Sequence, residues 1–296
     1  MKTSNSVSQS SIVLEHVQRL NNFGFTVLKN HSNISARIKN DMLMLLASIC
    51  KNTEFEFNPK DNDLHSISKV IGEKDRGLIC NYYDSARSIL STYEVASDQL
   101  INSIAKKYMN TDNLLLQIND QIMRIDLPAE SQTYLGETND VEVSMLLPWH
   151  QDYPYNQGSK RSLTIYVPLQ DGDENNGGTL EVASKSHLEG LINHTYVKDQ
   201  VRLAEKNIEG ISYRVSDNQI SRFNTEKLYL DFSDILIFDM DLIHRSVPNN
   251  SGNTRFNLQV RLSDINDHAF CKRYPTIKSK RHFNLDKREQ ELITGI

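Results

Sequence analysis

The chain has 296 residues, of which 38% are hydrophobic and 24% charged, and its formal net charge is −5. This size suits one large domain, and the composition is typical of a folded globular protein. The acidic excess does not favour a nucleic-acid partner, and no apolar run approaches the roughly 18 residues that span a membrane. Three distant cysteines, Cys50, Cys80 and Cys271, predict neither a disulfide framework nor a zinc site. We expect a cytoplasmic protein without a nucleic-acid or membrane partner.

The first part of the chain predicts helices around one short strand. Apolar residues recur at helical spacing in 11–22, 36–50 and 88–108. Between the first two, the apolar run over 25–28 predicts a strand. Residues 53–87 are polar and irregular, so we expect a segment without regular structure that either covers a site or forms a surface loop.

From about residue 114 the pattern changes to short strands separated by turn residues. The run 255–262 alternates strictly, so one face of that strand is apolar and the other polar. Many short strands with Gly, Asn and Pro between them favour a sandwich or barrel. Helices that precede the strands favour the α+β class. The other predicted strands are 122–126, 163–167, 179–182 and 235–238, and the third of these follows a turn at 175–178.

The sharpest local pattern is Trp149-His150-Gln151-Asp152. On an extended chain His150 and Asp152 point to the same side, because strand side chains alternate. One imidazole and one carboxylate can then bind one metal ion. A His-x-Asp pair often arises by chance, and a single histidine is more often a surface or core residue than a ligand. The pair therefore needs further support.

That support comes from a group about ninety residues downstream. His244 could complete a set of two histidines and one carboxylate, which leaves half of the coordination sphere of iron open for a bidentate co-substrate and oxygen. Arg255 follows His244 by 11 residues, and its planar fork could bind a carboxylate through two nitrogens. Ser246 could add a hydrogen bond. We predict a metal site at His150, Asp152 and His244 and a carboxylate site at Arg255 and Ser246.

These residues lie in segments that resemble the phytanoyl-CoA dioxygenase-like (PhyH) family of iron(II)- and 2-oxoglutarate-dependent oxygenases. The resemblance covers most of the chain and is strongest between residues 145 and 262. It implies an α+β fold with a double-stranded β-helix core (a jelly roll, cupin-like) and flanking N-terminal helices. We expect one domain over 1–296, with helical support in 1–113, the jelly-roll core in 114–270 and a C-terminal extension in 271–296. The matching segments are 23–28, 149–152, 176–180, 186–190, 244–246 and Arg255.

The resemblance also implies a role for each residue. His150, Asp152 and His244 would bind iron(II), while Arg255 and Ser246 would bind the distal carboxylate of 2-oxoglutarate. With oxygen, the co-substrate would become succinate and carbon dioxide as a small molecule is hydroxylated, desaturated or cyclised. Related halogenases carry Gly or Ala at the carboxylate position, so Asp152 argues against halogenation.

Several neighbouring residues allow two interpretations. Arg124, on the predicted strand 122–126, could meet a carboxylate of substrate or co-substrate, or form a salt bridge with a nearby acid. Tyr153 and Tyr155 follow the metal motif and could contact substrate or simply pack. Gln151 should face away from the two ligands beside it, which favours a structural role.

Two further features have a functional and a structural interpretation. His187 and Glu189 have the spacing of a second ligand pair. The better interpretation is that this stretch closes a strand and starts the following loop, as it does in the family. The polar segment 191–226 could be a lid or an insertion without a role in turnover. The remaining histidines have no evident partners and are expected at the surface or in packing, namely His16, His31, His65, His194, His268 and His282.

Two other functions fit the fold class. A cupin-like metal-dependent isomerase or epimerase would use the metal as a Lewis acid and would need neither oxygen nor Arg255. A non-catalytic small-molecule binding protein would need no ligand set at all. The complete constellation favours the dioxygenase, and in each case the expected partner is a small molecule.

Overall fold

The computed structural model describes residues 3–31, 33–128, 146–174, 180–203, 206–273 and 287–294. The predicted turn at 175–178, His282 and most of the predicted C-terminal extension lie outside these residues. None of the helices in the described part combines the length and apolar character that a membrane span requires.

The α-helices are α1 (Thr3–Phe23), α2 (Ile34–Cys50), α3 (Leu64–Lys74), α4 (Arg76–Ala86), α5 (Glu94–Ser97), α6 (Gln99–Met109), α7 (Tyr153–Asn156), α8 (Asp217–Ile220), α9 (His268–Arg273) and α10 (Lys287–Thr294), and the 3-10 helices are η1 (Leu90–Tyr93), η2 (Ile118–Asp120) and η3 (Ser186–Glu189). The strands are β1 (Phe25–Leu28), β2 (Leu114–Leu116), β3 (Ile122–Asp126), β4 (Leu163–Pro168), β5 (Leu180–Ala183), β6 (Thr195–Leu203), β7 (Lys206–Arg214), β8 (Thr225–Leu228), β9 (Ile235–Asp239), β10 (His244–Ser246) and β11 (Arg255–Asp264).

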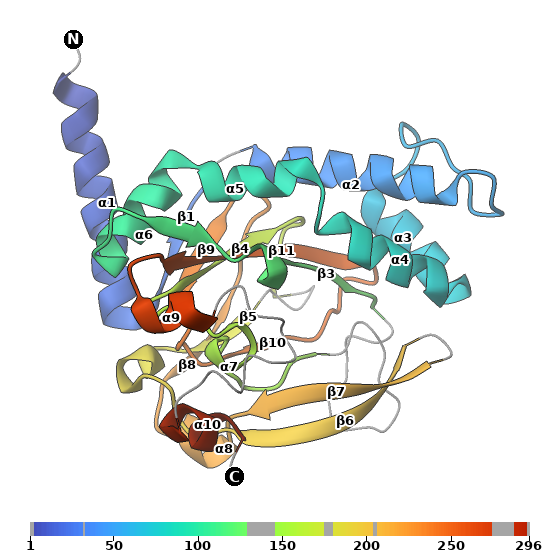
Figure 1. The fold of residues 1–296 in the computed structure, drawn as a ribbon. Coiled ribbons are helices and arrows are strands. Elements are labelled where there is room, and N and C mark those ends of the chain that lie inside the picture. The colour runs from blue at the N-terminus through green and yellow to red at the C-terminus, as the bar shows by residue number, and fades with distance from the viewer. Residues whose placement is uncertain are drawn as a thin grey trace.

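The largest sheet is built around β11, its longest strand. β11 pairs antiparallel with β4 along one edge and with β3 and β2 along the other. Beyond β4, the strands β9 and β1 extend the sheet. The resulting order is β1-β9-β4-β11-β2, with β3 also beside β11 (Figure 1). Both edges of β11 are therefore hydrogen-bonded, which fixes the register of every side chain that it carries.

The two faces of this sheet bury different residues, because side chains alternate along each strand. One face packs against α2, α3, α4 and α6 in a large apolar core that includes Met42, Tyr82, Ile104 and Leu258. The opposite face packs on a smaller sheet, in the order β10-β5-β8, through residues such as Tyr166. Figure 1 shows these helices on one side of the large sheet and β5 and β10 on the other. Antiparallel sheets with helices outside them confirm the predicted α+β class.

The expectation of an irregular segment over 53–87 is wrong, because α3 and α4 lie there. The carboxylate of Asp63 accepts hydrogen bonds from the N–H groups of His65 and Ser66, and that of Asp75 accepts one from Leu78. Such caps satisfy backbone donors that a helix leaves unpaired at its start. The two helices bury a stripe that includes Leu64, Ile71, Ile79 and Tyr82. The many polar residues on their outer faces made this stripe hard to recognise in the sequence.

The predicted helix over 88–108 is interrupted. η1, α5 and α6 follow one another in this stretch, and Asp98 separates the last two. Asp98 has an extended conformation (φ −62°, ψ 129°), and its side chain accepts hydrogen bonds from Leu100 N and Ile101 N. It therefore ends one helix and caps the next.

The polar segment 191–226 contains regular structure. β6 and β7 pair as an antiparallel hairpin, which in Figure 1 lies on the side of the small sheet away from α2. Next, α8 begins with a capping box formed by Ser216 and Gln219, and β8 joins the small sheet beside β5. A role for this segment as a lid stays a prediction.

Two histidines that were expected to lack partners are buried and hydrogen-bonded. The ring nitrogens of His65 lie 2.8 Å from Thr254 O and 3.1 Å from Leu169 O. His194 Nδ1 lies 2.8 Å from Ile192 O. Burial lowers the pKa of His194 from 6.5 to about 4, so this ring is neutral in the folded protein near pH 7.

Leu258 tests the apolar core on the helix-facing side of β11. Its side chain is fully buried, and Leu258→Ala should lower the free energy of unfolding by about 2–5 kcal/mol through lost burial and a cavity. Leu90→Ala, at a side chain that is 82% exposed, should change it by less than about 0.5 kcal/mol. Urea denaturation of both variants measures the difference, and equal stabilities would contradict this packing.

His194 should make the protein less stable in mild acid. The unfolded chain takes up a proton near pH 6.5, whereas the folded protein resists protonation until about pH 4. The free energy of unfolding should therefore fall as the pH drops from 6.5 to 4, by up to about 3 kcal/mol from this group. Urea unfolding across this range should give a shallower pH dependence for His194→Gln than for the wild type, and identical slopes would refute the assignment.

Candidate metal centre

His150 and His244 lie opposite each other in an antiparallel bridge. His150 N donates to His244 O at 2.9 Å, and His244 N donates to His150 O at 2.9 Å. His244 opens β10, which pairs with β5 of the small sheet. The two ring centroids are 4.2 Å apart. Residues 94 positions apart in the chain are thereby held side by side by backbone hydrogen bonds.

The expectation that Asp152 lies on an extended strand with His150 is wrong. Asp152 has a helical conformation (φ −71°, ψ −27°) and precedes the short helix α7. Its N–H donates to Met240 O at 2.9 Å. The carboxylate nevertheless turns toward the histidines, since Asp152 Oδ1 lies 3.8 Å from the Nε2 atoms of both His150 and His244. The three buried side chains form a group that could hold a metal ion, with one ligand atom each and all of these atoms within 4.8 Å of one another.

Backbone carbonyls orient both imidazoles. His150 Nδ1 lies 2.7 Å from Pro148 O, and His244 Nδ1 lies 2.9 Å from Leu242 O. A carbonyl can only accept, so each Nδ1 carries the proton and donates it. Each Nε2 then presents its lone pair to Asp152, which is the tautomer that a metal requires.

The protonation states also suit a metal. Burial and the neighbouring His244 lower the pKa of His150 to about 3, and burial lowers the pKa of His244. Burial alone would raise the pKa of Asp152, but Arg261 and the two histidines bring it down to about 2. At neutral pH the centre thus offers two neutral imidazoles and one carboxylate, which is the donor set of non-haem iron(II) sites with open positions.

A cluster of two arginines and one acid lies beside this centre. Arg255 Nε and Nη2 both lie 3.2 Å from Asp126 Oδ2, and Arg255 Nη2 donates to Val247 O at 2.8 Å. Arg124 Nε and Nη2 donate to Asp126 Oδ1 at 3.1 and 2.7 Å. Two guanidinium groups around one carboxylate leave a positive balance, which favours an anion in this part of the molecule. A small cavity joins the cluster to the histidines and is lined by Arg124, Asp126, Leu147, His150, Tyr166, Leu180, His244, Ser246, Arg255, Asn257 and Gln259.

Of the residues next to the triad, Ser246 faces the cavity and Gln151 does not. Ser246 lines the cavity, and its Oγ accepts a hydrogen bond from Leu147 N at 3.2 Å. Gln151 turns away from the centre as expected, because its amide donates to Gly190 O at 2.8 Å and to Asp241 O at 2.6 Å. These bonds give Gln151 a structural role between two loops.

The two tyrosines of the motif lie in α7 and differ in their surroundings. Tyr153 is buried, and its hydroxyl donates to Glu289 Oε1 of α10 at 2.8 Å. The ring of Tyr155 meets that of His150 edge to face, with centroids 5.6 Å apart. The Tyr155 hydroxyl accepts a hydrogen bond from Tyr213 N at 2.9 Å.

Sequence reasoning missed Asp126, Thr164 and Arg261. Asp126 ends the predicted strand 122–126, yet only the pairing of β3 with β11 brings it to Arg255. Thr164 and Arg261 both contact the carboxylate of Asp152. The alternation of 255–262 contains a signal for Arg261, since it places this side chain on the same face as Arg255.

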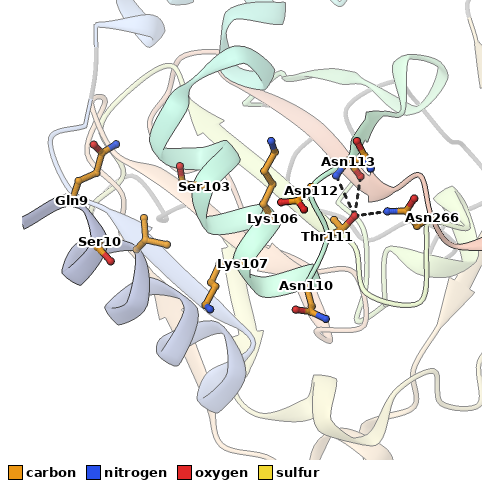
Figure 2. Close-up of a pocket in the computed structure, with 11 residues that line it drawn as sticks. Gln9, Ser10, Ser103, Lys106, Lys107, Asn110, Thr111, Asp112, Asn113 and Asn266 are labelled. Atoms are coloured by element: carbon orange, nitrogen blue, oxygen red, sulfur yellow. Dashed lines mark hydrogen bonds between the residues drawn. The ribbon is translucent and has the colours of Figure 1, made fainter. Parts of the chain in front are cut away.

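A separate pocket of about 720 Å³ lies between α1 and α6 (Figure 2). Gln9 and Ser10 of α1 face Ser103, Lys106 and Lys107 of α6 across it. No residue of the triad lines this pocket, and the described residues contain no metal-ligand group there.

Comparison with known proteins agrees with this geometry. A family model described as phytanoyl-CoA dioxygenase (PhyH) matches residues 86–257. The 1-deoxypentalenic acid 11-beta-hydroxylase of Streptomyces exfoliatus is 26% identical over 209 residues, which cover 65% of this chain and 71% of that protein.

Solved structures share the fold. AviO1 from Streptomyces viridochromogenes Tue57 matches with a TM-score of 0.50 at 14% identity, over 86% of this chain and 96% of AviO1. EctD from S. alaskensis, solved with 2-oxoglutarate and 5-hydroxyectoine, matches with a TM-score of 0.53 at 12% identity, over 86% of this chain and 76% of EctD. These matches confirm the expected jelly-roll core. The family model covers more than half of the chain, so this protein belongs to the phytanoyl-CoA dioxygenase (PhyH) family of iron(II)- and 2-oxoglutarate-dependent oxygenases.

Proposed function

We propose that the protein hydroxylates a small molecule, using iron(II), 2-oxoglutarate and oxygen. The observation that carries this proposal is the convergence of His150 Nε2, His244 Nε2 and Asp152 Oδ1 in one buried cluster. Family membership supplies the identity of the metal and co-substrate, and the cluster supplies the donors that iron(II) takes in this class of site.

His150, Asp152 and His244 are the proposed iron ligands. No proton has to leave them before a metal binds near pH 7, because both rings are neutral and the carboxylate is ionised. When bound, iron, 2-oxoglutarate and oxygen would supply the oxidising chemistry, in which 2-oxoglutarate becomes succinate and carbon dioxide. The protein's own part is to orient these groups and to exclude water from a buried site.

Arg255 and Ser246 are the proposed partners of the distal carboxylate of 2-oxoglutarate. Both line the cavity that contains His150 and His244. Asp126 holds the guanidinium of Arg255 in one orientation, which reduces the entropy lost when an anion binds. Arg124 shares this acid and is proposed to contact a carboxylate of the co-substrate or substrate.

Hydroxylation is the proposed outcome. The relative from Streptomyces exfoliatus is named as a hydroxylase, and the EctD structure contains a hydroxylated compound. Asp152 keeps the carboxylate that related halogenases lack. Tyr155, packed on His150, stays a proposed substrate contact, whereas the hydrogen bond from Tyr153 to Glu289 supports a packing role for Tyr153.

Removal of one ligand tests the metal centre. Wild-type protein should bind iron(II) without oxygen and form succinate from 2-oxoglutarate in air. Asp152→Ala should bind iron more than about 10-fold more weakly and form no hydroxylated product. Anaerobic titration calorimetry and chromatography of succinate measure both effects.

Glu189→Ala is the matched control for Asp152→Ala. Glu189 also follows a histidine by two positions, but it lies outside the cluster, where it pairs with Arg222. This variant should keep wild-type metal affinity and activity. A wild-type protein that binds neither iron nor 2-oxoglutarate would rule out the proposed function.

Arg255→Gln tests the co-substrate site separately from the metal. Loss of a charge-assisted pair, about 1.5–3 kcal/mol, should weaken 2-oxoglutarate binding about 10- to 100-fold. Iron affinity should stay within about threefold, because Arg255 is not a ligand. Anaerobic titration with 2-oxoglutarate, followed by the visible band of its iron(II) chelate, measures the change. Unaltered 2-oxoglutarate affinity would place its carboxylate elsewhere.

A further inference from the structure

A buried arginine contacts the carboxylate of the metal centre. Arg261 is 1% exposed and lies on the same face of β11 as Arg255, six residues further along. Its Nη2 lies 3.2 Å from Asp152 Oδ2. Burying a charged guanidinium is costly unless it is paired and hydrogen-bonded, so Arg261 needs partners held in fixed positions.

Two further contacts fix the Arg261 side chain independently of the metal centre. Arg261 Nη1 donates to Asp120 O at 2.6 Å, and Nη2 also donates to Gln259 Oε1 at 2.8 Å. These partners come from η2 and from β11 itself. The planar fork of an arginine is well suited to such an arrangement, because it directs several donors at set angles. Arg261 therefore offers Asp152 a hydrogen bond from a fixed position.

The two oxygens of Asp152 have different environments. Oδ2 accepts a hydrogen bond from Thr164 Oγ1 at 2.6 Å and one from Arg261 Nη2 at 3.2 Å. Oδ1 lies 3.8 Å from the Nε2 atoms of His150 and His244. One oxygen is thus engaged by the protein, and the other faces the space where the ligand atoms converge.

We propose that Arg261 is a positioning residue which, together with Thr164, restricts Asp152 to binding the metal through Oδ1 alone. This inference rests on the proposed function of the triad. A carboxylate without these two donors could rotate and bind the metal through both oxygens. It would then occupy a coordination position that the co-substrate or oxygen needs. Hydrogen bonds to a metal-binding carboxylate commonly have this orienting effect.

A structural role alone would give a different pattern of effects. If Arg261 only satisfied the carbonyl of Asp120, its replacement would lower stability and leave the metal's affinity and coordination unchanged. A readout of the coordination itself, in addition to activity, therefore separates the two roles. Cobalt(II) provides one, because its visible absorption responds to the number and geometry of its ligands.

The test uses the whole protein, freed of metal and titrated with cobalt(II) and with iron(II) in the absence of oxygen. Arg261→Gln should bind either metal about 10- to 100-fold more weakly than the wild type and show an altered cobalt spectrum. Arg261→Lys keeps the charge but not the fork, and should show the same spectral change with a smaller loss of affinity. Thr164→Val should shift the spectrum in the same direction, and Thr164→Ser, which retains the hydroxyl, should restore it.

Tyr82→Phe is the control for loss of a buried hydroxyl. The Tyr82 hydroxyl donates to Met42 O in the helical layer at 3.0 Å, so its removal should lower the unfolding midpoint and leave cobalt binding unchanged. Wild-type affinity and spectrum in both Arg261→Gln and Thr164→Val would overturn the inference while leaving the proposed function intact. If Arg261→Gln does not fold, Arg261→Lys decides by the same criterion. A wild-type protein that binds no metal would overturn the proposed function and the inference with it.

Discussion

The centre of this protein depends on one pair of backbone hydrogen bonds, those exchanged by His150 and His244. A backbone bridge sets the separation of two side chains more firmly than any contact between the side chains can. The carbonyls of Pro148 and Leu242 then set the orientation of each ring. The position of the two imidazoles is therefore determined by the main chain, before any ligand binds.

β11 provides the other half of the centre. Its polar face carries Arg255 at one end and Arg261 further along, while its apolar face joins the helical core. Because strands on both edges fix its register, Arg255 and Arg261, the second of which contacts Asp152, keep a constant spacing. The same strand therefore packs against the helical core with one face and carries Arg255 and Arg261 on the other.

The sequence predicted the elements whose signals are local and missed the contacts that arise from tertiary pairing. Alternation identified β11, and the spacing of His150, Asp152 and His244 identified the ligand set even though Asp152 lies on a turn. Helices α3 and α4 were missed because their exposed faces are polar, although Asp63 and Asp75 stand at their starts as capping residues. The pairing of Asp126 with two arginines depends on strand register, which no local pattern specifies.

The hydrogen bond between Tyr153 and Glu289 connects the last helix, α10, to the residue that directly follows Asp152. In addition, His194 N donates to Leu292 O of the same helix at 3.0 Å. Helix α10 thus contacts the residue beside Asp152 directly. A substitution that removes the Glu289 carboxylate would therefore release the Tyr153 hydroxyl next to Asp152 while His150, Asp152 and His244 themselves stay unchanged.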